Sequence, residues 1–317
     1  MRRIYIMCIM LFFFCDCQKE FDVREPTDTE LCLICFPGRQ DTTVIQLYNT
    51  VPIGGRYEGT PFLNNASLAY AVNSVSKEVK YASSTMGSIP QGCWFVEVDH
   101  KSGDYVEIIA NTIECEMIKA STIIPPPPPD FEFECTNSAG AILTIRFDDD
   151  QTTADYYGIA LICERTIYKS GDCFTEVKNL NLVTDGYGTH EISVIRDHYD
   201  VGFTGSFLWP RISDNYGVRI WPDTIISGNK AVLSARFGSG YFDIEPDNSQ
   251  ETRRYKVRLY RFTEDFYKHI VALNYQVFND YATYGIAPMM PSYTNVEGGC
   301  GIFAGWSMRD SDWFEMK

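Results

Sequence analysis

The residues that build most catalytic and metal-binding sites are scarce in this sequence. None of its four histidines pairs with another at a metal-ligand spacing such as His-x-x-x-His. A Gly-x-Ser-x-Gly nucleophile motif is absent, and so is a phosphate-binding loop with its lysine. Cys32 and Cys35 enclose Leu33 and Ile34 in a predicted strand, where positions three apart point to opposite faces. We therefore expect no metal, no cofactor and no enzymatic activity.

Acidic residues offer one alternative. Asp148, Asp149, Asp150 and Asp155 carry carboxylate oxygens of the kind that bind Ca²⁺, but they lack the Asp-x-Asp-x-Asp-Gly order of a calcium loop. We favour a solvated turn after a strand. A hydrolase built on two carboxylates that meet across space stays open as a third interpretation of function, because the fold sets their separation.

Positive charge is also in short supply. The chain has 27 Lys and Arg against 42 Asp and Glu, a formal net charge of −15 and a pI of about 4.7. Nucleic-acid binding depends on neutralising phosphates, so this balance argues against a nucleic-acid partner. It is typical of a protein that stays soluble beside an anionic cell surface.

Long hydrophobic runs are missing except at the start of the chain. The run from Ile4 to Phe14 has eleven residues, whereas a membrane-spanning helix needs about 20. Arg2 and Arg3 precede it and a polar segment follows, which is the layout of a secretory signal. A small-x-small cleavage site is lacking, but a cysteine ends the run. We predict a lipoprotein signal peptide over residues 1–16, an acylated Cys17, and an anchor and tether over residues 17–26.

Eight cysteines remain beyond the signal and the anchor, and an even number in an exported chain permits disulfides. Cys163 and Cys173 flank a turn-like Lys169-Ser170-Gly171-Asp172, so we predict a disulfide between them. The alternative is that most of these cysteines are buried free thiols.

Five consecutive prolines, Pro125 to Pro129, predict a stiff linker over residues 124–129, because proline can join neither a helix nor a sheet ladder. Residues 27–123 show short β-branched and aromatic runs separated by turn residues, which predicts an immunoglobulin-like β-sandwich. Residues 130–317 predict a β-rich C-terminal domain with one α-helix at about 264–279, capped by Thr263. The predicted fold class is therefore mainly β.

Two aromatic segments rich in turn-forming residues are candidates for binding, since loops on a rigid scaffold often carry recognition. Their candidate residues are Phe203, Phe207, Trp209, Tyr281, Tyr284 and Met289. The alternative is that these side chains fill the core of the second domain.

The last part of the chain carries three glycines in four positions, which predicts a loop that needs positive φ or close backbone approach. The loop residues are Asn295, Gly298, Gly299, Gly301 and Phe303. Ile302, Ala304, Trp306 and Met308 then alternate, which predicts a closing strand.

Several stretches of the chain together carry a family resemblance. They are Cys17-Gln18-Lys19-Glu20, Ile123-Ile124-Pro125, Phe147-Asp148-Asp149 with Tyr156-Tyr157, Asp200 to Gly205, and Asn295 to Phe303. In these stretches the chain resembles the Bacteroidota outer-membrane lipoproteins known as domain of unknown function 4249, which are often encoded beside TonB-dependent receptors. The acidic segment after Cys17 is similar to signals that send such lipoproteins to the outer face of the outer membrane.

The resemblance implies a lipid-anchored outer-membrane protein that faces the cell exterior and works with a TonB-dependent β-barrel receptor in nutrient uptake. It implies no catalytic residues. We expect a non-enzymatic accessory or ligand-capture protein. The alternative is a structural or assembly lipoprotein of an outer-membrane complex that binds no small molecule.

Overall fold

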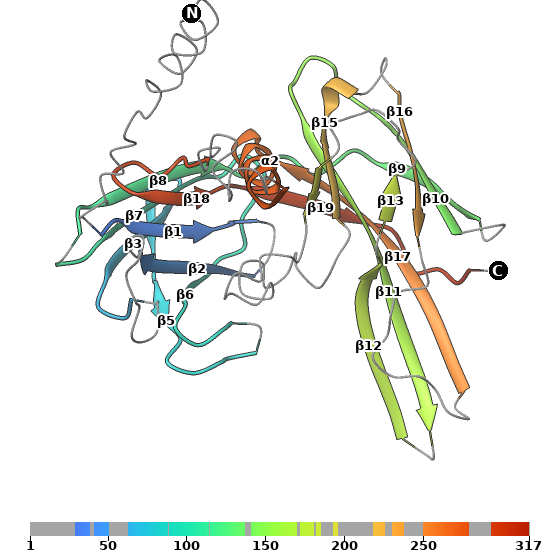
Figure 1. The fold of residues 1–317 in the computed structure, drawn as a ribbon, viewed down its shortest axis with the longest axis horizontal. Helices are drawn as coiled ribbons and strands as arrows, with labels where there is room; N and C mark the ends of the chain where they lie inside the picture. Colours follow the sequence, from blue (N-terminus) through green and yellow to red (C-terminus); the bar gives the residue numbers. More distant parts are fainter. Residues whose placement is uncertain are drawn as a thin grey trace, which may run out of the picture.

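The computed structural model is mainly β and is arranged as two modules joined side by side (Figure 1). It describes residues 29–38, 41–50, 63–87, 89–113, 115–136, 141–169, 172–180, 182–184, 193–195, 218–225, 230–237, 250–278 and 293–316. None of the helices in these ranges is both long and apolar enough to span a membrane.

The N-terminal module is a sandwich of two sheets. One sheet has the strand order β18-β1-β2-β6-β5 and the other has the order β4-β3-β7-β8. The strands are β1 (Leu31–Cys35), β2 (Thr42–Asn49), β3 (Ser67–Val72), β4 (Val75–Lys77), β5 (Lys80–Tyr81), β6 (Trp94–Glu97), β7 (Tyr105–Asn111), β8 (Ile118–Ile123) and β18 (Cys300–Phe303).

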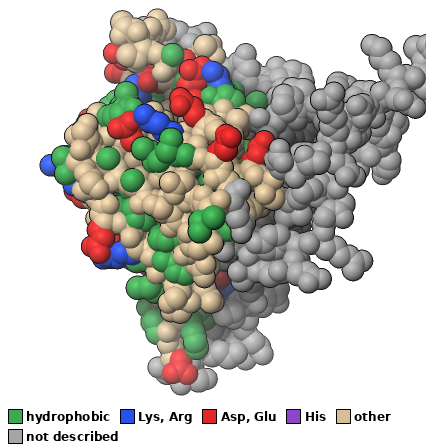
Figure 2. Space-filling view, turned by 90° about the vertical axis from the view of Figure 1, so that its left-hand side faces the viewer, with side chains coloured by type: hydrophobic (Ala, Val, Ile, Leu, Met, Phe, Trp, Pro, Cys, Tyr) green, Lys and Arg blue, Asp and Glu red, His purple; other side chains and the backbone are tan. Residues whose placement is uncertain are grey.

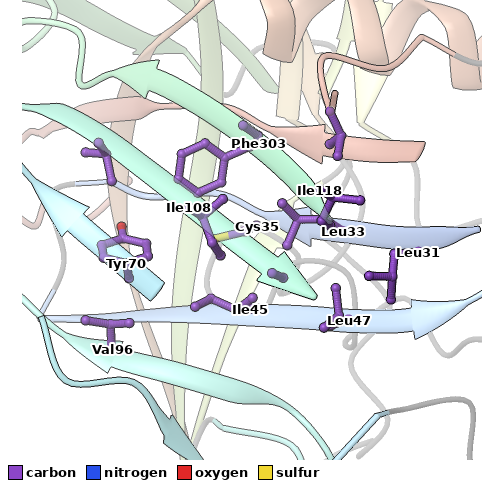
Figure 3. Packing of buried hydrophobic residues seen from close by; sticks show 14 of the residues in the cluster. Leu31, Leu33, Cys35, Ile45, Leu47, Tyr70, Val96, Ile108, Ile118 and Phe303 are labelled. Atoms are coloured by element: carbon purple, nitrogen blue, oxygen red, sulfur yellow. The ribbon is translucent and has the colours of Figure 1, made fainter. Parts of the chain in front are cut away.

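The core of this module follows from two-residue alternation. In β7, Val106, Ile108 and Ala110 are buried while their neighbours face outward. They meet Leu31 and Leu33 of β1 across the space between the sheets (Figure 3). The predicted sandwich is therefore observed.

The C-terminal module also contains two sheets. Their orders are β13-β16-β10-β9 and β14-β15-β11-β17-β19, with β12 paired to β11. The strands are β9 (Phe131–Thr136), β10 (Ala141–Asp148), β11 (Tyr156–Lys169), β12 (Asp172–Leu180), β13 (Leu182–Thr184), β14 (Ser193–Ile195), β15 (Val218–Pro222), β16 (Lys230–Phe237), β17 (Gln250–Phe262) and β19 (Trp306–Asp310). A short 3-10 helix, η2, covers Asp223–Ile225.

Helix α2 (Glu264–Phe278) follows β17 directly and agrees with the helix expected from the sequence. The carbonyl of Thr263 accepts the N–H of Tyr267 at 3.2 Å, which opens the helix. The predicted side-chain cap is wrong, because Thr263 Oγ1 is buried without a hydrogen-bond partner among the described residues. Glu264 and Asp265 lie in the first turn, where negative charge stabilises a helix. Phe266 and Ile270 are buried one turn apart and hold the helix against the sheets.

The two modules share one segment, because the chain returns to the N-terminal module near its end. Strand β18 pairs in parallel with β1, and Val296 and Phe303 belong to the N-terminal core. After Ala304 and Gly305 the chain enters β19 and pairs with β17 of the C-terminal module. The predicted range 130–317 is therefore not one unit, and the predicted single closing strand is two strands in two sheets.

Candidate functional site

The side chain of Asn295 helps to hold the described residues 293–299, which directly precede β18. The Asn295 side-chain amide donates from Nδ2 to the Phe303 carbonyl at 2.8 Å, and its Oδ1 accepts the Phe303 N–H at 2.9 Å. The same Nδ2 reaches Asp265 Oδ2 at 3.2 Å, in the first turn of α2. Asn295 therefore takes the place of a neighbouring strand for Phe303 and ties the loop to the helix.

The glycines of this loop are required by close backbone approach. Gly298 has φ +78° and a Cβ there would lie 2.6 Å from the Met117 carbonyl oxygen. Gly301 has φ +107° and faces the backbone of Leu33 so closely that a Cβ has no room. The structure thus brings together the predicted residues Asn295, Gly298, Gly299, Gly301 and Phe303. We call this loop, together with the start of β19 that follows it, the joint, because it connects the two modules.

The proline run packs against the same joint. Ser307 Oγ donates to the Pro126 carbonyl at 2.7 Å, and Arg309 Nε donates to the Pro128 carbonyl at 2.8 Å. Carbonyl oxygens of prolines are available in this way because a polyproline segment has no internal hydrogen bonds. The connection between the modules is therefore docked along β19.

A hydrophobic cluster lies between the modules. Phe36 of the N-terminal module meets Phe266 of α2, with ring centroids 5.4 Å apart, and Ile302, Ala304 and Trp306 pack into the same cluster. Buried aromatic contact of this kind resists hinge motion, since separating the modules would expose it to water. The described contacts therefore favour one fixed orientation.

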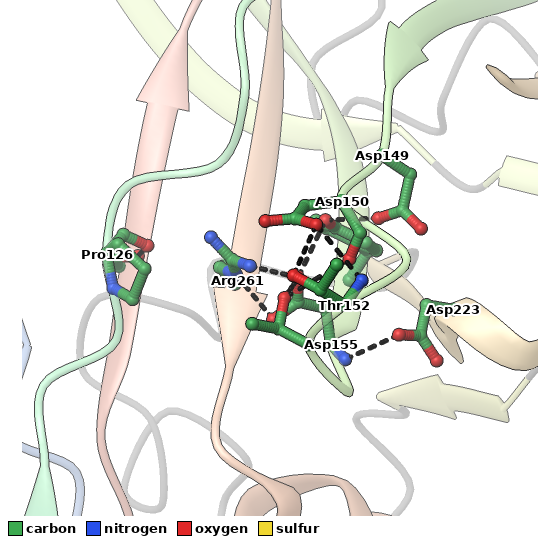
Figure 4. A network of polar contacts seen from close by, with 10 residues as sticks. Pro126, Asp149, Asp150, Thr152, Asp155, Asp223 and Arg261 are labelled. Carbon is green, nitrogen blue, oxygen red and sulfur yellow. Dashed lines mark hydrogen bonds and ion pairs between the residues drawn. The ribbon is translucent and has the colours of Figure 1, made fainter. Parts of the chain in front are cut away.

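Two of the stretches that carry the family resemblance, Phe147-Asp148-Asp149 and Tyr156-Tyr157, meet at the β10–β11 turn (Figure 4). Phe147 and Tyr157 lie with ring centroids 5.0 Å apart, and Tyr157 donates its hydroxyl to Asp149 Oδ1 at 2.7 Å. Burial raises the pKa of Asp149 and also that of Tyr157. Tyr157 therefore keeps its proton at neutral pH and acts as a donor.

Asp155 is the centre of the network in Figure 4. Both of its oxygens accept from the Arg261 guanidinium, and its backbone N–H donates to Asp223 Oδ2 at 2.7 Å. Thr153 Oγ1 adds a third donor to this carboxylate at 3.0 Å. A carboxylate with these donors and an arginine beside it is occupied in holding the turn. Within the described ranges, no group of His, Cys, Asp and Glu side chains is arranged to hold a metal ion.

Two described histidines are buried and serve as neutral hydrogen-bonding groups. His269 Nδ1 lies 3.2 Å from the Tyr293 carbonyl, so this nitrogen carries the proton, and burial lowers the pKa of His269 to about 4. His100 Nε2 lies 2.8 Å from the Tyr70 hydroxyl, and burial lowers its pKa as well. Neither side chain is charged at neutral pH.

The C-terminal module extends into a three-stranded ribbon that sequence reasoning missed. We call residues 163–169 of β11, residues 172–178 of β12 and residues 250–255 of β17 the arm. These three strands continue beyond the residues that pair with β15 and β19, and they project away from the body of the molecule (Figure 1). The apolar residues Phe174, Val177 and Leu180 of β12 are three apart and follow no two-residue period, so the sequence carries little signal for this strand.

Hydrophobic side chains are exposed along the arm. Phe174 is 55% exposed, and Tyr168 and Val177 are each 48% exposed. Figure 2, which turns the left-hand side of Figure 1 toward the viewer, shows hydrophobic side chains at the lower end of the molecule as well as over the rest of this face. By the register of the ladder, Tyr168 and Val177 lie on one face of the ribbon and Phe174 lies on the other. Exposed apolar side chains on both faces of a projecting ribbon are typical of a contact surface for another protein.

The predicted disulfide between Cys163 and Cys173 is wrong. The hairpin exists, but Cys163 lies opposite Lys178 and Cys173 lies opposite Tyr168, so five positions of the ladder separate them. At about 3.4 Å per residue this is far beyond the reach of a disulfide. Cys163 is buried and Cys173 is exposed, and both are free thiols.

Other predicted site residues lie outside the described residues. They are the anchor Cys17 and the binding candidates Phe203, Phe207, Trp209, Tyr281, Tyr284 and Met289. Their roles stay predictions.

Comparison with known proteins identifies the family. A family model described as a domain of unknown function (DUF4249) matches residues 18–311, which includes both modules and the joint. A search of curated proteins finds no match. Because the family model covers most of the sequence, the chain belongs to the DUF4249 family.

Proposed function

We propose that this protein is a non-enzymatic, lipid-anchored accessory of a TonB-dependent outer-membrane receptor, and that it contacts the receptor through the arm. The observation that carries the proposal is the exposed set Tyr168, Phe174 and Val177 on strands that project from the body. Each Å² of apolar surface that is buried at an interface stabilises the contact by about 25 cal/mol.

The joint supports an accessory role for a different reason. A protein that presents a contact surface at a set distance from its anchor loses less entropy on binding when its parts are already fixed. Here Asn295, the docked prolines and the cluster around Phe36 and Trp306 hold the two modules together.

The location rests on the start of the sequence. Arg2 and Arg3, the apolar run and Cys17 form a lipoprotein signal, and an anchor at Cys17 would leave a short tether before β1 begins at Leu31. The receptor as partner rests on the family resemblance described above.

The test is recovery of partners from native membranes. Tagged wild-type protein is crosslinked and purified beside an arm variant, Phe174→Ser with Val177→Ser, and a control, Val232→Ser. Val232 is 63% exposed on β16, away from the arm, so it matches the change in surface polarity. A β-barrel receptor that purifies with the wild type and the control, and is lost from the arm variant, supports the proposal. Recovery of the receptor with all three contradicts it.

A structural or assembly role is the second candidate, and one observation favours it. The outer face of the β7–β8 sheet exposes Tyr105 directly opposite Ile123, and it exposes Ile109 four residues further along β7. Two separate apolar surfaces suit a protein that holds two others together. Recovery of an assembly or secretion complex without a receptor would select this candidate.

A further inference from the structure

Two cysteines from opposite ends of the described chain face each other in the N-terminal module. In the parallel pair β1–β18, Cys32 lies opposite Cys300. Neighbouring strands are about 4.7–4.9 Å apart, which falls inside the Cα separation of about 4.4–6.8 Å that a disulfide spans. Opposed residues of a ladder also direct their side chains to the same face of the sheet.

The two thiols are in contact. A hydrogen bond joins them, and it lowers the pKa of the Cys32 thiol and raises that of Cys300. Tyr48, opposite Cys32 on the next strand, also hydrogen-bonds to Cys32 and favours its thiolate. A thiolate beside a second thiol is the arrangement from which a disulfide forms.

Other cysteines near β1 do not compete for this pair. Cys35 lies three positions along β1, points to the opposite face and is buried in the core, where burial raises the pKa of its thiol. Cys115 Sγ lies 3.4 Å from the Thr29 carbonyl and packs against that same core. Cys300 is only half-buried, so an external reagent has access to the pair.

We propose that Cys32 and Cys300 form a disulfide that joins β1 to β18 once the protein is exported. The timing rests on the export that the proposed function assumes, while the pairing rests on the geometry alone. The oxidant is the disulfide of an exported thiol oxidase or of a small molecule such as oxidised glutathione.

The reaction is a thiol–disulfide exchange. One thiolate of the pair attacks the oxidant's disulfide and releases one of its sulfurs, and the second thiolate then displaces the other sulfur. The pair loses two protons and two electrons, and the oxidant gains them as two thiols. The new bond would hold the segment that continues into β19, and with it the joint between the modules.

Two measurements test the proposal on the full chain. Purified reduced protein is incubated with oxidised glutathione, and protein exported in cells is alkylated at once to trap its thiols. In both cases we expect a peptide pair containing Cys32 and Cys300, a mass lower by about 2 Da because two hydrogens leave, and faster migration on a non-reducing denaturing gel. Cys32→Ser and Cys300→Ser should each abolish these changes, and the control Cys115→Ser should leave them.

Two outcomes overturn the proposal. If both thiols are alkylated after treatment with glutathione, or if either pairs with another cysteine, the pairing is wrong while the accessory role stands. If the bond forms with glutathione and is absent from protein that has reached the membrane, formation on export is wrong. Loss of receptor binding in the arm variant is measured separately, so the two proposals fail independently.

Discussion

The indole N–H of Trp306 donates a 3.1 Å hydrogen bond to the carbonyl of Phe36, a residue 270 positions earlier in the chain. Trp306 begins β19 in the C-terminal module, whereas Phe36 directly follows β1 in the N-terminal module. The ring is fully buried and lies 5.9 Å from the ring of Tyr260. Trp306 thus connects the two modules, with a hydrogen bond to the N-terminal module and a ring contact within the C-terminal module.

Trp306→Ala should lower the free energy of unfolding by about 3–5 kcal/mol, because it removes a large buried ring and leaves a cavity between the modules. Trp306→Phe should cost less, since it keeps most of the packing and loses the hydrogen bond. Urea unfolding followed by circular dichroism measures both. Trp313→Ala is the control, because Trp313 lies at the surface against Arg254 and Lys256 and should cost about 1 kcal/mol. Equal losses for Trp306→Ala and Trp313→Ala would contradict the role of Trp306.

Asn295→Ala should destabilise the protein by about 2 kcal/mol, because it leaves the N–H and carbonyl of Phe303 without their partner. Asn295→Asp keeps an acceptor for the N–H but loses the donor and places a carboxylate beside Asp265, so it should not restore stability at pH 7. Chemical denaturation of the three proteins measures this. Wild-type stability in Asn295→Asp would show that the Nδ2 bonds contribute nothing.

Gly301→Ala should cost at least about 3 kcal/mol or prevent folding, because φ +107° excludes a side chain and Leu33 blocks the space. Gly103→Ala is the matched control. It also has positive φ, at +84°, but nothing lies within 4 Å of its Cβ position, so it should cost only about 1–2 kcal/mol. Soluble yield and thermal unfolding distinguish the two. Similar costs at both glycines would mean that backbone angle alone matters.

His269 should make the protein less stable in mild acid. Its folded pKa of about 4 lies below the unfolded value of about 6.5, so the unfolded chain takes up the proton first as the pH falls. The contribution is fully present above pH of about 6.5 and is lost as the pH falls through the folded pKa, for a total of roughly 3 kcal/mol.

The measurement is the free energy of unfolding between pH 7 and pH 5, above the range in which ion-paired carboxylates such as Asp310 titrate. His269→Gln removes the titrating group and keeps a donor for the Tyr293 carbonyl, so its stability should change less over this range. Parallel pH profiles for the two proteins would refute the assignment.

Most strands are visible in the sequence. In β16 (Lys230–Phe237), the buried residues Ala231, Ala235 and Phe237 all lie on one face of the strand, as the two-residue period of its sequence indicates. The helix expected at 264–279 is α2, Glu264–Phe278. Both were predictable because a strand with one buried face alternates every two residues, and a helix follows its own period of 3.6.

The arm was not predicted from the sequence. β12 reads Asp-Cys-Phe-Thr-Glu-Val-Lys-Asn-Leu, and it is exposed over much of its length. An exposed strand gives weak hydrophobic periodicity, so β12 was not predicted.

The sequence by itself determined the mainly β fold, the helix and the need for glycine near the end of the chain, because each depends on neighbouring residues. Only the tertiary structure decided that β18 lies beside β1, that Cys32 meets Cys300, and that Trp306 reaches Phe36. Pairing between strands hundreds of residues apart depends on which edges and apolar faces remain uncovered after local structure has formed, and no local pattern records that choice.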